Sequence, residues 1–110
     1  MADCLFCQMV SGEVPTHKIY EDDTIFVIKD INPKARVHLL VIPKIHIPSL
    51  NDVQEEHAAL LGYMMTSLKN FAKEQGLEGF RTIINTGKGS GQQIFHLHVH
   101  VLGGGNLPSF

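Results

Sequence analysis

The stretch "IFHLHVHVL", residues 94–102, decides the fold, because its polar and apolar side chains alternate with a period of two. Such alternation is typical of a half-buried β-strand, in which side chains at i and i+2 share one face. We therefore expect His96, His98 and His100 on one face and the intervening apolar residues on the other. At about 3.3 Å per residue the outer rings begin about 13 Å apart, so all three cannot bind one metal ion. Three histidines on one face indicate metal or proton chemistry.

The rest of the chain predicts four further strands. Residues 19–20 and 24–29 form a hairpin around an Asp-Asp turn. The apolar run "VHLLVIP", residues 37–43, is a buried strand that ends at proline, and residues 80–86 form another strand. Short connections between neighbouring strands favour antiparallel pairing. We therefore predict an α+β domain with a five-stranded antiparallel sheet and one main helix, and no Rossmann fold, because the regular β–α–β alternation is missing.

The main helix is predicted between residues 51 and 76. Apolar residues recur at spacings of three and four from Leu60 to Ala72, which is the pattern of one buried helix face. Asn51 is expected to cap the first turn, with Gln54 completing a capping box, and Gly76 to end the helix. We expect this helix to cover the sheet and to carry no chemistry.

Length and charge narrow the classes of function. The chain of 110 residues fits a single domain, residues 1–110, and its formal net charge of −2 gives no overall attraction to nucleic acid or to an anionic membrane. No apolar run is long enough for a membrane span, and the first ten residues lack the basic start and long apolar stretch of a secretory signal. We therefore expect a cytoplasmic protein with reduced thiols.

The motif "CLFC" places Cys4 and Cys7 in a C-x-x-C pair near the start of the chain. No strand precedes the motif, as one does in thioredoxin-like redox proteins. A structural zinc site needs four ligands, so the pair supplies half of one. Two small buried hydrophobic residues are the alternative interpretation, because free cysteine is often simply buried.

A glycine-rich loop, "GKGSGQQ" at residues 87–93, leads directly into the histidine strand. Its backbone N–H groups can form a concavity for an anion, and a flexible hairpin loop is the alternative. It is not a Walker loop, since no Gly-Lys-Ser or Gly-Lys-Thr sequence opens a helix. A phosphate held here would lie beside the histidines, where a neutral imidazole can act as a nucleophile or a proton carrier.

The motif "HLHVHVL", residues 96–102, resembles the signature of the histidine-triad superfamily of nucleotide hydrolases and transferases. The segments "FVIKDINPKARVHLLVIPKIHI" and "INTGKGSGQQIFHLHVHVLGG" resemble its histidine-triad nucleotide-binding branch, and the similarity runs from Cys4 to Gly104. The resemblance implies a hydrolase that cleaves purine nucleoside phosphoramidates, or related adenylyl conjugates, through a nucleotidyl-histidine intermediate. It also implies a homodimer that joins sheet edges and packs helices together.

The resemblance implies a role for individual residues. His98 would be the nucleophile on the α-phosphorus, while His100 and His38 would hydrogen-bond near the phosphate and complete the catalytic set. The implied nucleotide-binding residues are Asp30 and Ile31 for ribose and base, and Asn85, Gly91, Gln92 and Gln93, with His98 and His100, for ribose and phosphate. Some close members carry serine where this chain has Gln93, and an amide cannot shuttle a proton as a hydroxyl can.

The resemblance also implies a structural zinc ion. Several family members bind zinc through a C-x-x-C pair, a histidine after a proline turn and the first histidine of the triad. The matching residues here are Cys4, Cys7, His46 and His96. Such a Cys₂His₂ set is a closed tetrahedral arrangement, and it leaves the other two triad histidines for the phosphate.

Two other functions compete with the phosphoramidate hydrolase. The first is a non-catalytic purine-nucleotide-binding or partner module, whose histidines merely hold phosphate. The second is a zinc hydrolase that uses two triad histidines and a metal-bound water. The zinc hydrolase lacks an obvious third ligand with an open coordination position, and replacement of His98 separates the binding module from the hydrolase.

Overall fold

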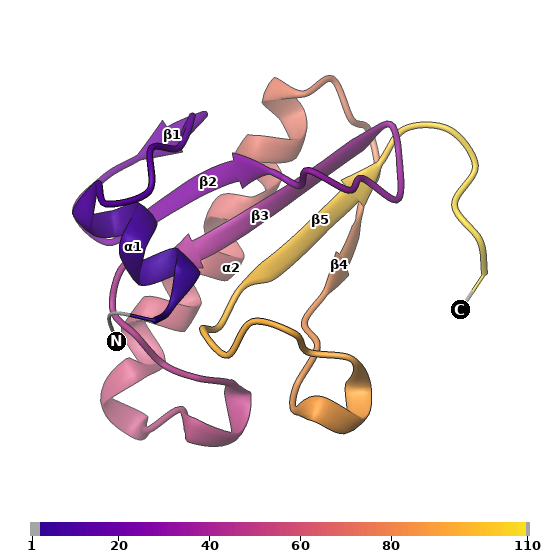
Figure 1. Ribbon diagram of the computed structural model, residues 1–110. Helices are drawn as coiled ribbons and strands as arrows, with labels where there is room; N and C mark the ends of the chain where they lie inside the picture. Colours follow the sequence, from indigo (N-terminus) through magenta and orange to yellow (C-terminus); the bar gives the residue numbers. More distant parts are fainter. Residues whose placement is uncertain (1–2, 110) are drawn as a thin grey trace.

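The computed structural model describes residues 3–109, which form one antiparallel sheet flanked by two α-helices (Figure 1). Met1, Ala2 and Phe110, which the single-domain prediction includes, lie outside the described residues. The strands are β1 (Tyr20–Glu21), β2 (Ile25–Lys29), β3 (Val37–Pro43), β4 (Arg81–Ile83) and β5 (Val99–Gly103). Their order across the sheet is β1-β2-β3-β5-β4, and every neighbouring pair is antiparallel, which confirms the predicted fold class.

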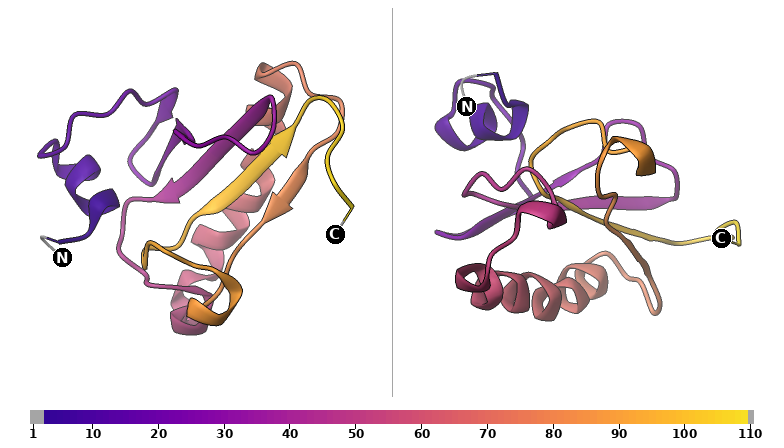
Figure 2. Two further views of the ribbon diagram at one scale, coloured as in Figure 1. Left: turned by 45° about the vertical axis from the view of Figure 1, so that its right-hand side comes forward. Right: turned by 90° about the horizontal axis from the view of Figure 1, so that it is seen from below.

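The two α-helices lie on opposite faces of the sheet. α2 (Ala58–Glu74) lies along one face, and α1 (Leu5–Ser11) lies on the opposite face (Figure 2). The core on the α2 side includes Val41 and Met64, and the core on the α1 side includes Phe6. Burial on both faces explains why β3 reads as a continuous apolar run instead of an alternating one.

The predicted histidine strand is a strand only in its second half. β5 begins at Val99, and residues 94–98 precede it without strand pairing. The N–H of Leu97 donates instead to the main-chain oxygen of Ile47, in the loop after β3, at 2.7 Å. Within β5 the predicted alternation is confirmed, because Val99 packs in the core on the α2 side while His100 lines a cavity on the α1 side.

The start of the main helix differs from the prediction. Ser49, and not Asn51, caps a first 3₁₀ turn, with its Oγ accepting from the Asn51 N–H at 3.1 Å. Gln54 pairs with His57, whose Nδ1 accepts from the Gln54 N–H at 2.9 Å. The α-helix itself begins only at Ala58, after two 3₁₀ turns, and not near Asn51 as predicted. Gly76, with φ 77°, follows the last turn as predicted. The 3₁₀ turns in residues 3–109 are η1 (Leu50–Asp52), η2 (Glu55–His57) and η3 (Lys88–Ser90).

α1 is a helix that the sequence pattern did not predict. The Cys4 Sγ accepts from the Cys7 N–H at 3.4 Å at its start, and Gly12, with φ 85°, ends it. Seven residues are too few to show a clear helical period, which is why the helix was missed. Neither α1 nor α2 is long and apolar enough to cross a membrane.

Candidate active site and metal site

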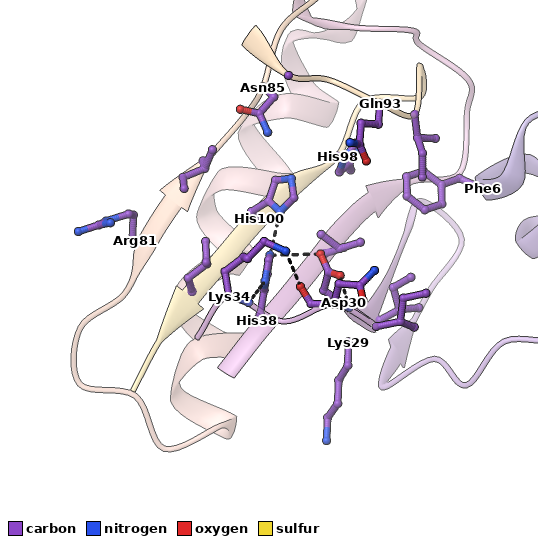
Figure 3. A pocket seen from close by; sticks show the side chains of 18 of the residues that line it. Phe6, Lys29, Asp30, Lys34, His38, Arg81, Asn85, Gln93, His98 and His100 are labelled. Atoms are coloured by element: carbon purple, nitrogen blue, oxygen red, sulfur yellow. Dashed lines mark hydrogen bonds and ion pairs between the residues drawn. The ribbon is translucent and has the colours of Figure 1, made fainter. Parts of the chain in front are cut away.

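A cavity of about 600 Å³ opens on the α1 side of the sheet (Figure 3). It is bounded by α1 at one end and runs across β2, β3 and β5 toward β4. The predicted site residues that line it are Asp30, Ile31, His38, Asn85, Gly91, Gln93, His98 and His100. The fold therefore gathers segments that are distant in sequence around one concave space of the size that small ligands occupy.

His98 lines this cavity with one ring nitrogen unprotonated. Its Nδ1 lies 2.8 Å from the main-chain oxygen of His96. Because a carbonyl only accepts hydrogen bonds, Nδ1 carries the proton, and Nε2 keeps its lone pair in the neutral ring. Burial lowers the pKa of His98, so the ring is neutral at pH 7. A bare imidazole nitrogen is what nucleophilic catalysis by histidine requires.

A chain of hydrogen bonds fixes the protons of His38 and His100 in the same way. The Lys34 N–H donates to His38 Nδ1 at 3.0 Å, so the proton of the neutral His38 ring sits on Nε2. That Nε2–H lies 2.9 Å from His100 Nδ1, which accepts it. His100 then carries its own proton on Nε2 and can donate it to a ligand.

Both rings of this pair are neutral at pH 7. Burial lowers the pKa of His38. Burial also lowers the pKa of His100 to about 4, and the neighbouring rings of His98 and His38 add to the effect. A neutral pair keeps the donor and acceptor pattern fixed, so the cavity offers a donor at His100 beside a lone pair at His98.

Asp30 and Ile31 lie at the rim beside this pair. Asp30 Oδ1 accepts from the Asn32 N–H at 2.8 Å, and Oδ2 lies 3.4 Å from His38 Nε2. Each carboxylate oxygen has a second lone pair, so Asp30 can still accept hydrogen bonds from the hydroxyl groups of a ligand. Ile31 is 91% exposed and gives the mouth of the cavity an apolar surface.

Gln92 is the predicted nucleotide-binding residue that does not line the cavity. Its side chain is buried, with Oε1 accepting from the Gly87 N–H at 2.9 Å. Its Nε2 donates to the main-chain oxygens of Pro48 at 2.8 Å and Ile94 at 3.0 Å. The amide therefore ties the glycine-rich loop to the segment before α2 and sets the shape of the loop.

α1 supplies cavity-lining residues that the sequence reasoning missed. They are Leu5, Phe6 and Met9. Phe6 is 1% exposed, and its ring meets the His98 ring edge-on with the centroids 5.1 Å apart. The C-x-x-C motif could have predicted the position of Phe6. Phe6 lies between Cys4 and Cys7, and if these cysteines bind the same metal ion as His96, Phe6 must lie close to the triad.

Cys4, Cys7, His46 and His96 form a separate cluster beside the cavity. Their ligand atoms all lie within 4.8 Å of one another. The sulfur-to-Nδ1 distances are 3.3 Å from Cys4 to His96, 3.3 Å from Cys7 to His46 and 3.6 Å from Cys7 to His96. A tetrahedral zinc ion, with Zn–S of about 2.3 Å and Zn–N of about 2.0–2.1 Å, places sulfur and nitrogen about 3.6 Å apart. The donor set and its spacing therefore fit zinc.

His96 has the tautomer that a metal ligand needs. Its ring is fully buried, and Nε2 lies 2.7 Å from the main-chain oxygen of Pro43, so Nε2 carries the proton. Nδ1, which faces the sulfur atoms, is then bare, and a carbonyl partner on the other nitrogen is the usual support of a metal-bound histidine. The structure thus places His96 with the thiols, and His98 and His100 in the cavity.

The group Asp30, His38 and His100 also has ligand atoms within 4.8 Å of one another, but it does not fit a metal ion. His38 Nδ1 accepts from the Lys34 N–H, so neutral His38 has no lone pair on the Nε2 that faces the other two residues. These residues form a hydrogen-bond network. The geometry therefore disfavours the zinc-hydrolase alternative, which needs a metal at the triad.

Comparison with known sequences gives long matches. Residues 3–107 match the family model described as scavenger mRNA decapping enzyme C-term binding. Protein HitA of Neisseria gonorrhoeae is 50% identical over 104 residues, which cover 94% of this chain and 97% of that protein. The purine nucleoside phosphoramidase of Escherichia coli K12 is 39% identical over 104 residues, which cover 93% of this chain and 87% of that enzyme.

Solved structures share the fold. A histidine triad protein from Clostridium difficile has a TM-score of 0.94 at 40% identity, covering 100% of this chain and 97% of that chain. A zinc-bound histidine triad family protein from Mycobacterium smegmatis has a TM-score of 0.79 at 39% identity, covering 92% of this chain and 74% of that chain. The five-stranded sheet with its main helix is therefore common to this chain and these neighbours.

Proposed function

The chain belongs to the histidine-triad family, and from this premise we propose that it hydrolyses purine nucleoside phosphoramidates, or related adenylyl conjugates, with His98 as the nucleophile. The observation that carries the proposal is the bare Nε2 of His98 in the cavity, with the Nε2–H of His100 on the neighbouring ring. The name of the Escherichia coli relative, a purine nucleoside phosphoramidase, supports the class of substrate.

The reaction consists of two displacements at the α-phosphorus. His98 Nε2 attacks phosphorus, and the bond from phosphorus to the amine breaks, which gives a nucleotidyl-histidine. The His100 Nε2–H donates to a phosphoryl oxygen and stabilises the charge that develops there. The carbonyl of His96 holds the His98 Nδ1–H and stabilises the cationic ring of the intermediate. Water then attacks phosphorus, and the nucleoside monophosphate leaves as the bond to His98 breaks.

The other cavity residues bind the nucleotide. Asp30 accepts hydrogen bonds from the ribose hydroxyls, Ile31 lies against the base, and Asn85 and Gly91 position the ribose and phosphate. Support comes from their common place on the cavity wall and from the φ of 95° at Gly91, which turns the backbone there. Gln93 faces the leaving group and donates a hydrogen bond but no proton, so the departing amine takes its proton from water.

The sulfur cluster holds a structural zinc ion in this proposal. The ligands are Cys4, Cys7, His46 and His96, whose spacing fits the ion, and the zinc-bound neighbour from Mycobacterium smegmatis supports the assignment. With four protein ligands a zinc ion supplies stability and offers no open position to a substrate.

The proposed assembly is a homodimer formed through α2 and the free edge of β4. β4 ends the sheet, the large apolar side chain of Phe80 is exposed just before β4, and Met65 is exposed on α2. Pairing two β4 edges would satisfy their backbone groups and bury these side chains. We expect light scattering to give twice the chain mass of 12.2 kDa. The mass of a single chain across the micromolar range would contradict the assembly.

The proposed function is tested by trapping the intermediate. Protein is mixed with a slowly hydrolysed adenosine phosphoramidate, quenched with acid-free denaturant, and digested for mass spectrometry. We expect an adenylyl group on the peptide that contains His98, because the first displacement leaves the nucleotide on that ring. Rapid turnover with an adduct on another residue, or with no adduct at any time point, would contradict the assignment.

A further inference from the structure

Phe6 lies between the sulfur cluster and the cavity and contacts both. Cys4 and Cys7 flank it in sequence, at the N-terminal end of α1. Its ring lies edge-on to His96, with the centroids 5.6 Å apart, and to His98, with the centroids 5.1 Å apart. It is 1% exposed and forms part of the cavity wall. One buried side chain therefore joins the two sites, and Figure 3 shows its ring at the end of the cavity near His98.

α1 depends on distant contacts for its position. It has seven residues, and an isolated helix shorter than about 12–15 residues is only marginally stable in water. The Cys4 sulfur caps its N-terminus, and the sulfur atoms of Cys4 and Cys7 also contact His96 and His46. The Cys4 thiol therefore caps the start of the helix, and both thiols attach the helix to the rest of the protein.

The sulfur cluster also reaches His98 through the main chain. The His96 ring is held at both nitrogens, by Pro43 O at 2.7 Å and by the Cys4 sulfur at 3.3 Å. The carbonyl of the same residue accepts the Nδ1–H of His98 at 2.8 Å. Because both nitrogens of the His96 ring have fixed partners, the backbone of His96 is restrained as well. The cluster therefore also orients the unprotonated Nε2 of His98.

We propose that the cluster of Cys4, Cys7, His46 and His96 is a clamp that sets the nucleotide affinity of the cavity and the orientation of His98. The clamp holds Phe6, which forms part of the cavity wall. It also holds the main-chain carbonyl of His96, which accepts the hydrogen bond that orients His98. The inference rests on the proposed function only for its ligand, a purine nucleoside monophosphate. His46 is the residue to change, because it binds Cys7 and does not line the cavity.

The experiment compares His46→Ala with His46→Cys. His46→Ala removes one ligand, whereas His46→Cys restores four as Cys₃His, which is also a structural zinc set. We expect the Kd for AMP, measured by calorimetry, to rise about tenfold in His46→Ala and to return to within about twofold of the wild type in His46→Cys. The proton resonance of His98 Nδ1–H should be sharp in the wild type and in His46→Cys, and broadened by exchange in His46→Ala. A general loss of packing would not be repaired by a thiol.

Two further variants allow the proposal to be tested even if His46→Ala does not fold. Phe6→Leu retains all four ligands, so we expect bound zinc, a sharp His98 resonance and weaker AMP binding. His17→Ala removes an exposed histidine outside both sites and should match the wild type in every readout. Unchanged AMP affinity in Phe6→Leu, or an unchanged affinity and resonance in folded His46→Ala, would overturn the clamp. If the variants change the AMP affinity and the His98 resonance as expected but the wild type hydrolyses no phosphoramidate, the proposed function is wrong and the clamp is still supported.

Discussion

His98→Ala will hydrolyse an adenosine phosphoramidate about 10⁴-fold to 10⁶-fold more slowly than the wild type, which is the usual cost of removing a nucleophile. No second ring among the described cavity residues can replace it. His100 carries its proton on Nε2, and its Nδ1 already accepts from His38. His38 carries its proton on Nε2 because its Nδ1 accepts from the Lys34 N–H. Among the histidines of residues 3–109 that line the cavity, only His98 has an unprotonated ring nitrogen without a hydrogen-bond donor.

AMP binding shows whether His98→Ala has lost only the reaction or has also lost the binding site. We expect the Kd for AMP to change by less than about tenfold in His98→Ala, because the ribose and loop contacts remain. Single-turnover kinetics and calorimetry on the same sample measure both quantities, and His17→Ala serves as the histidine-to-alanine control. Hydrolysis that survives in His98→Ala would assign the attack to another group. A wild type that binds AMP and hydrolyses nothing would favour the binding module.

Purified wild-type protein will contain about one equivalent of zinc per chain, and Cys4→Ser will contain less than about a tenth, since a structural site needs all four ligands. Serine is a good helix N-cap, so it can still accept from the Cys7 N–H at the start of α1. The substitution therefore removes a metal ligand while it keeps the capping bond. Elemental analysis of protein purified without added metal measures the result.

Zinc loss will also lower stability by several kcal/mol, because metal binding to a structural site contributes directly to folding. For a domain of this size a change of 1 kcal/mol moves Tm by about 4–8 °C, so a chelator should lower Tm by about 10 °C or more. The same chelator should leave Tm of Cys4→Ser unchanged, which controls for effects on the rest of the protein. Wild-type protein that contains no zinc, and whose Tm does not change when a chelator is added, would contradict the proposed metal site.

The sheet and the grouping of the histidines were predictable because their signals are local and strong. The run from Val37 to Pro43 has no polar residue except His38, and β3 has these bounds. The period of two placed His100 opposite the apolar face of β5. Each of these predictions depends only on the alternation of side chains along an extended chain. The alternation did not predict residues 94–98, where a bond to Ile47 takes the place of strand pairing.

The features that escaped prediction depend on contacts between distant segments. α1 has no period to read, and Cys4, which caps it, is not a usual capping residue. The start of α2 was misplaced because two 3₁₀ turns, η1 and η2, occupy the predicted first turns and the α-helix begins only at Ala58. The inward turn of Gln92 follows from its bond to Pro48, 44 residues away. The proton positions on His96 and His100 are likewise set by partners that are remote in sequence, Pro43 and His38.

The first donor in the hydrogen-bond chain through His38 and His100 is the main-chain amide of Lys34, not a side chain. Every amino acid except proline supplies that donor. Replacing Lys34 with a neutral residue other than proline therefore keeps this donor, although it removes a charge that lowers the pKa of His38 and a side chain that lines the cavity. Variants at residue 34 should therefore keep the proton positions on His38 and His100, whereas Lys34→Pro should lose them.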